Sequence, residues 1–232
     1  MNQRTFVSLL AMASLVSTSA QPPRASDSEH RATIQCPYDG QTFSLKASGE
    51  TYIGEHGDIV VRGRLTQLSN DGGAIFTFSR RGRVVFRKSI TDLSNPNGWI
   101  SISADQKWFA INSSDGGAAG GWSVSILHVQ DDGTIRDLTG AMSSVMKDFS
   151  SRHNCATRGD NYESLRWIAP DQLLLVASVY GTSDCGPEMG YAEGFVLQSS
   201  TGRILQRYSE LELLHLYETC TINTWLPDSS AK

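Results

Sequence analysis

Apolar and polar residues alternate along much of the chain with the two-residue period that is typical of half-buried β-strands. The alternating runs form groups of four, and turns containing Gly, Asp or Asn separate them. The clearest group occupies residues 98–139, and a second copy occupies residues 165–208. The strands expected in the two copies are residues 99–103, 107–112, 122–129 and 134–138, then residues 165–168, 173–179, 192–198 and 203–208. The pattern predicts an all-β protein.

The two copies share a register on both sides of their central loop. Asp105 and Gln106 correspond to Asp171 and Gln172, and Gly133 corresponds to Gly202. A third, degenerate copy is expected over residues 51–91, with Gly82 in the place of those two glycines and no evident first strand. Its expected strands are residues 57–65, 74–78 and 83–86. Four-stranded units repeated in this way are typical of a β-propeller.

The first clear copy resembles one blade of the TolB-type propeller family. The similar segments read ISADQKWFA at 102–110, SILHV at 125–129 and DGTIRDLT at 132–139. That family has a Pro-Asp-Gly turn before the second strand, whereas this chain lacks the glycine in both copies. The resemblance implies a small propeller-like array and implies little about activity, because such repeats occur in binding proteins and enzymes alike.

A closed propeller needs at least four blades, and the sequence shows three. A fourth blade would have to combine strands from the two ends of the chain, such as residues 42–46 with residues 219–225. The alternative is an open sheet or a β-sandwich built from the same hairpins.

Helix is expected in one short segment between the second and third copies. Met142, Val145, Met146 and Phe149 have the spacing of one helix face, which predicts an amphipathic helix packed on a sheet. Residues 211–217 are compatible with either helix or strand.

The first 20 residues have the features of a secretory signal peptide: a basic residue, an apolar run and a small-residue end. Residues 21–31 are expected to form a flexible leader, and residues 32–232 a single domain. We therefore expect an exported protein, periplasmic or extracellular, that is soluble after cleavage and not embedded in a membrane. The formal net charge of −4 and the absence of a basic block argue against nucleic acid as the partner.

Four cysteines follow the signal peptide, and an even number in an oxidising compartment favours two disulfides. The blade arrangement places Cys155 and Cys185 on one face and brings Cys36 and Cys220 beside the two end strands. We predict the pairs Cys155 with Cys185 and Cys36 with Cys220.

No nucleophile, cofactor or metal motif is present in the sequence, so no cofactor and no metal are expected. His153 lies in a long polar segment with the acids Asp160 and Glu163. A glycosidase-like pair of carboxylates would come from Glu188 and Glu193 with Asp160. The weak catalytic candidates are therefore His153, Asp160 and Glu188.

The topology of a four-stranded blade places the long segments 113–121, 140–164 and 180–190 on one side, with tight turns on the other. Long loops on one side of a repeat scaffold commonly mark a binding surface. The expected function is a non-catalytic module that engages a protein or an envelope component, and the alternative is a carbohydrate-active hydrolase or lyase. The candidate binding residues are Trp122, Arg158, Tyr180, Glu188 and Tyr191.

Overall fold

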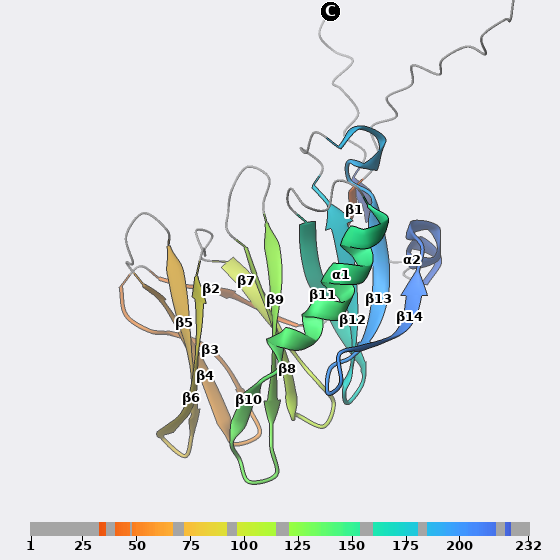
Figure 1. Ribbon diagram of the computed structural model, residues 1–232. Coiled ribbons are helices and arrows are strands. Elements are labelled where there is room, and N and C mark those ends of the chain that lie inside the picture. Colours follow the sequence, from red (N-terminus) through yellow and green to blue (C-terminus); the bar gives the residue numbers. More distant parts are fainter. Residues whose placement is uncertain are drawn as a thin grey trace, which may run out of the picture.

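Three antiparallel sheets lie side by side in the computed structural model, and none of them closes into a barrel (Figure 1). The structure describes residues 33–35, 40–46, 48–66, 72–91, 97–114, 121–153, 160–180, 185–216 and 221–223. Within these residues strands predominate over helices, so the prediction of an all-β protein is confirmed.

Each sheet contains four strands that follow one another in the sequence. The first sheet is formed by β3 (Thr51–His56), β4 (Ile59–Thr66), β5 (Gly73–Arg80) and β6 (Arg83–Thr91). The second is formed by β7 (Asn97–Ile102), β8 (Trp108–Ser114), β9 (Trp122–Val129) and β10 (Ile135–Asp137). The third is formed by β11 (Asp160–Ala169), β12 (Gln172–Val179), β13 (Ala192–Gln198) and β14 (Arg203–Tyr208). The first sheet includes β3, the strand that the sequence pattern did not reveal.

The end strands do not combine as the sequence predicted. β2 (Gln41–Ser44) adds to the second sheet as a fifth strand, antiparallel to β7. β15 (Thr221–Asn223) pairs instead with β1 (Thr33–Gln35), in a separate antiparallel ladder. The expected pairing of residues 42–46 with residues 219–225 is therefore wrong. The free edge of β7 takes up β2, because an unpaired strand edge leaves backbone donors and acceptors without partners.

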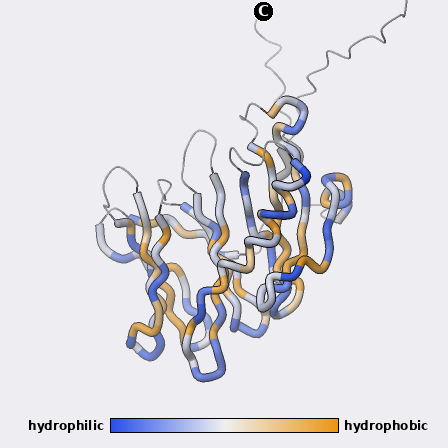
Figure 2. The backbone as a smooth tube through the Cα atoms, in the orientation of Figure 1, coloured by the Kyte–Doolittle hydropathy of each residue, from blue (hydrophilic) through white to orange (hydrophobic). Residues whose placement is uncertain are grey.

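The second sheet is buried on both faces, which makes it the centre of the fold. Phe109, Ile111 and Leu127 pack toward the first sheet, and Ala110 and Ile126 belong to the cluster shared with the third sheet. Figure 2 shows the apolar stretches of the chain running along the strands, between polar turns. Burial on both faces explains why β8 is buried at every position.

Helix α1 (Ser143–Arg152) continues from a 3-10 turn, η1 (Thr139–Met142), and contributes to the core between the second and third sheets. Met142, Val145 and Phe149 are buried there. Met146, which was expected in the same stripe, is instead 47% exposed because it lies at the margin of the helix face. The short helix predicted between the two clear copies is thus present, and its core face is narrower than expected.

A second helix, α2 (Glu210–Leu216), covers the other face of the third sheet. Leu213 is fully buried in a small cluster with Leu165, Leu174 and Val196. Ser209 and Glu212 cap its first turn reciprocally: Ser209 N donates to Glu212 Oε2 at 2.7 Å, and Glu212 N donates to Ser209 Oγ at 3.4 Å.

Candidate functional site

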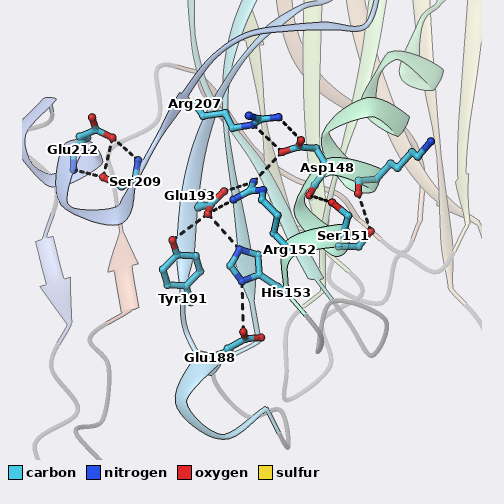
Figure 3. A network of polar contacts seen from close by, with 12 residues as sticks. Asp148, Ser151, Arg152, His153, Glu188, Tyr191, Glu193, Arg207, Ser209 and Glu212 are labelled. Atoms are coloured by element: carbon cyan, nitrogen blue, oxygen red, sulfur yellow. Dashed lines mark hydrogen bonds and ion pairs between the residues drawn. The ribbon is translucent and has the colours of Figure 1, made fainter.

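The candidate site lies where α1 ends against the third sheet (Figure 3). His153 is the residue that ends the helix, and its N–H donates to Phe149 O at 3.2 Å. Its ring lies 4.5 Å from the Phe149 ring and 4.7 Å from the Tyr191 ring, centroid to centroid. Because His153 follows Phe149 by one helical turn, it continues the buried face of α1 and is only 9% exposed.

Glu193, on β13, is the acid at the centre of the site. Arg152 Nη1 donates to Glu193 Oε1 at 2.5 Å, and Arg152 Nη2 forms an ion pair with Glu193 Oε2 at 2.5 Å. Tyr191 Oη donates to Oε1 at 3.0 Å, and His153 Nε2 lies 3.3 Å from the same oxygen. Burial acts to raise the pKa of Glu193, but the hydrogen bonds and charge of Arg152 outweigh it and hold the pKa below its ordinary value.

Arg152 also joins this carboxylate to a second one on the same helix. Its Nη2 lies 2.9 Å from Asp148 Oδ2, and Arg207 on β14 forms two further ion-pair contacts with Asp148. The hydrogen bond to Glu193 is the main cause that raises the pKa of Arg152. The network therefore fastens α1 to β13 and β14.

Glu188 approaches His153 from the other side. It ends the 3-10 turn η3 (Gly186–Glu188), and its Oε1 lies 3.9 Å from His153 Nδ1. That distance is too long for a hydrogen bond but short enough for an ion pair with a protonated imidazole. The two ring nitrogens of His153 thus face two different carboxylates: Nε2 faces Glu193, and Nδ1 faces Glu188.

Asp160 opens β11 close to the same cluster. Tyr162 Oη donates to Asp160 Oδ2 at 2.8 Å, while Asp160 Oδ1 is buried and has no hydrogen-bond partner among the described residues. Burial raises the pKa of Asp160, against the Tyr162 hydrogen bond and the charge of His153. Burial therefore favours the protonated form of the Asp160 carboxyl.

The second sheet reaches the same end of the molecule through Trp122, the first residue of β9. Its backbone N donates to Asn161 Oδ1 at 2.8 Å, and its ring lies 4.6 Å from the ring of Trp99. A buried seam continues from there: Ser164 N donates to Asn112 Oδ1 at 2.7 Å. β8, β12 and α1 end here, and β9 and β11 begin here. We call this end of the molecule the loop end.

The sequence candidates are distributed unevenly around the site. His153, Glu188 and Tyr191 meet in one cluster, and Asp160 lies near enough for the charge of His153 to act on it. Trp122 and Tyr180 lie at the loop end, on β9 and directly after β12. Arg158 lies outside the described residues, so its place in the site stays a prediction.

Arg152 and Tyr162 are the site residues that sequence reasoning missed. Arg152 follows Asp148 by four residues on the expected helix, a spacing that signals an ion pair on one helix face. No local signal indicates the contact of Arg152 with Glu193, because these residues are 41 positions apart and meet only through the fold.

Of the four cysteines, Cys185 lies in the described part of the chain, and it is disulfide-bonded. Cys36, Cys155 and Cys220 lie outside that part, as do the expected signal peptide and leader, so the pairing stays a prediction. In the register of the terminal ladder, Gln35 is the partner of Thr221. The sequence neighbours of this pair are Cys36 and Cys220.

The described ranges lack two other features. No group of three or more His, Cys, Asp or Glu side chains there could hold a metal ion. None of the helices in those ranges is long and apolar enough to cross a membrane. Comparisons of the chain with family models, curated proteins and solved structures give no match.

Proposed function

We propose that this protein is a non-catalytic binding module that is exported and engages a protein or envelope component through its loop end. The observation that supports the proposal is the surroundings of the His153 ring. Both of its ring nitrogens face acids of the protein, and Glu193 already accepts hydrogen bonds from Arg152 and Tyr191. A general base needs a nitrogen or oxygen that can reach a substrate proton. His153 Nε2 already lies 3.3 Å from Glu193 Oε1, and the residue is only 9% exposed.

The contacts of the cluster support a positioning role. Arg152 and Glu193 hold the end of α1 against β13, and His153 with Glu188 holds the turn η3 beside it. Three partly exposed aromatic side chains stand at the loop end: Trp122, Tyr180 and Tyr191. Rigidly held aromatic residues are the usual anchors of protein interfaces.

The propeller-like arrangement belongs to this proposal as well. Three consecutive four-stranded antiparallel units support an array of three blades. β11 contacts the second sheet by way of Asn112, Trp99 and Trp122, as the innermost strand of a blade would. The ladder of β1 with β15 brings the two ends of the chain together without completing a fourth blade.

The binding proposal is tested by immobilising the full chain and measuring retention of solubilised envelope proteins and of cell-wall fragments. We expect Trp122→Ala combined with Tyr180→Ala to lower retention at least tenfold. Ile168→Ala is the matched control, because Ile168 is 47% exposed at the opposite end of β11. Equal loss in both variants, or no retention by the unaltered chain, would contradict the proposal.

A carbohydrate-active hydrolase or lyase is the second candidate, and one observation favours it. The carboxyl of Asp160 has a raised pKa and a buried oxygen without a partner, which suits a general acid. The protein should be incubated with polysaccharide and cell-wall substrates, with and without divalent metal. Turnover that Asp160→Asn or His153→Ala abolishes, at an unchanged melting temperature, would establish catalysis and displace the binding-only proposal.

A further inference from the structure

The first sheet has a face that no described element covers. Val61, Phe76 and Phe78 point toward the second sheet and belong to the core cluster. Arg62, Thr77 and Arg87 alternate with those positions and therefore occupy the opposite face. The three are register partners across β4, β5 and β6, so they form one row. We call this surface the cationic face; it also includes Tyr52, Arg64 and Val84, and it lies on the side of the first sheet away from the second sheet in Figure 1.

The charge of the first sheet differs in sign from that of the whole chain. Residues 48–66 and 72–91 carry seven Lys and Arg side chains and three Asp and Glu side chains. The described part of this sheet thus has a surplus of four positive charges in a chain whose formal net charge is −4. A surface of this kind attracts anionic partners and steers their approach.

Two cations elsewhere on the sheet form ion pairs with acids, and those of the cationic face do not. Arg80 forms an ion pair with Asp58, and Lys88 lies 2.6 Å from Asp137. In contrast, Arg62, Arg64 and Arg87 are exposed and make no ion pair or hydrogen bond through their side chains with any described residue. The three arginines thus leave positive charge on this face that solvent ions or a ligand can neutralise.

A cavity of about 280 Å³ lies on this face. Arg64 and Arg87 line it from two strands, and Thr77, which is 7% exposed, lines it from the strand between them. Gly49, Glu50 and Leu65 complete the lining. Glu50 is the single acid there, so two guanidinium groups and one carboxylate leave the cavity with a net positive charge that one further carboxylate would balance.

We propose that the cationic face binds an extended acidic segment of a protein partner, with one carboxylate seated between Arg64 and Arg87 and a second, two residues away, on Arg62. Arg62 and Arg64 are two residues apart on β4, a separation of about 6.6–6.8 Å along the strand. Alternate side chains of an extended peptide have the same spacing, so two acids at positions i and i+2 match the two arginines. This second surface is distinct from the loop end and goes beyond the proposed function.

The other side chains of the face favour a protein partner over a polysaccharide or a small anion. Tyr52, the register partner of Arg62, is 56% exposed, and Val84 is 47% exposed. Arginine and tyrosine are enriched at the energetically important positions of protein interfaces, where exposed apolar groups complete the contact. Guanidinium groups also bind carboxylates through two parallel hydrogen bonds.

The test uses the full chain and a fluorescein-labelled synthetic peptide with glutamate at two alternate positions in a background of threonine and valine. Fluorescence anisotropy is measured at low and at high salt. We expect the peptide to bind, and its counterpart with glutamine in place of glutamate to bind at least tenfold more weakly. Arg64→Gln combined with Arg87→Gln should weaken binding at least tenfold, and Arg203→Gln, which removes one exposed arginine from the third sheet, should leave it within twofold.

Several results would overturn the proposal. These are no binding to the unaltered chain, equal binding of the two peptides, an equal loss in Arg203→Gln, or displacement of the peptide by polygalacturonate or inorganic phosphate at lower concentration. Self-association of the chain that the Arg64→Gln and Arg87→Gln double variant abolishes would show that the face binds a second copy instead. If the double variant melts early, a peptide with lysine in place of glutamate gives the same comparison on the unaltered chain, and equal binding of that peptide would also overturn the proposal.

Discussion

Arg152 meets Glu193 through one hydrogen bond and one ion-pair contact, each of 2.5 Å, and this pair joins the end of α1 to the middle of the third sheet. The Glu193 side chain is 9% exposed, whereas that of Arg152 is 37% exposed. The acid therefore depends on the arginine for its charge compensation more than the arginine depends on the acid.

Replacement of Arg152 by Gln should destabilise the protein by about 2 kcal/mol, because it leaves a buried carboxylate without its main partner. Chemical denaturation monitored by tryptophan fluorescence measures the change. Arg207→Gln is the matched control, since Arg207 is 54% exposed and also contacts an acid on α1. We expect Arg207→Gln to lower the free energy of unfolding by less than about 1 kcal/mol. Equal losses of stability in the two variants would show that the network does not depend on Glu193.

Glu163 gives a prediction that depends on pH. It pairs with Val176, which packs against the apolar cluster of α2, and its carboxyl has no hydrogen bond or ion pair within the described residues. Burial raises the pKa of Glu163 to about 7, from an ordinary value of 4.5. The folded state therefore binds this proton more tightly than the unfolded state, so the contribution of Glu163 to stability is greatest below pH 4.5 and is lost as the pH rises through 7.

Glu163→Gln removes the charge that the folded state disfavours. We expect the variant to be about 1–2 kcal/mol more stable than the unaltered chain at pH 8, a value reduced for partial solvent access, and nearly equal at pH 4. Thermal unfolding at the two pH values measures this difference. Glu55→Gln, at an exposed position of β3, should show no such dependence. A constant effect of Glu163→Gln across this range would exclude a raised pKa.

Gln106 has a positive φ of 58°, a conformation that costs a residue with a side chain about 1 kcal/mol and costs glycine nothing. It stands in the turn before β8, where TolB-type repeats have glycine. Gln106→Gly should therefore raise stability by about 0.5–1 kcal/mol. Gln172 corresponds to it in the next copy but belongs to strand β12. Gln172→Gly should lower stability by a similar amount, and urea denaturation of the two variants checks both signs.

Much of the fold could be predicted because apolar and polar residues alternate within the strands themselves. The expected strands at 122–129, 192–198 and 203–208 coincide with β9, β13 and β14. The first half of β11 was missed, since Asp160, Asn161 and Glu163 interrupt the pattern. Asp160 and Asn161 gain their partners only from the folded chain, Tyr162 for the first and the Trp122 N–H for the second.

The sequence contains a signal that predicts the start of helix α2. The spacing of Ser209 and Glu212 is that of a capping box, and it distinguishes a helix start from a strand where the hydrophobic pattern does not. The contacts within the candidate site, in contrast, have no such local signal. His153, Glu188 and Glu193 could be named as candidates, but their contacts join α1, η3 and β13 across the fold, and no local pattern predicts which nitrogen meets which carboxylate.

The remaining prediction is the cysteine pairing. Because Gln35 and Thr221 are partners in the β1 and β15 ladder, continuing that register by one residue pairs Cys36 with Cys220. Cys185 is disulfide-bonded, so this pairing leaves Cys155 as its partner. We expect non-reducing peptide mapping to recover the Cys36 with Cys220 and Cys155 with Cys185 peptides. The first closes a loop over most of the chain, and on the chain-entropy model its removal by Cys36→Ser with Cys220→Ser should cost about 4–5 kcal/mol. Recovery of a peptide joining Cys36 to Cys155 or Cys185 would exclude this pairing and contradict the expectation that a disulfide fastens the terminal ladder.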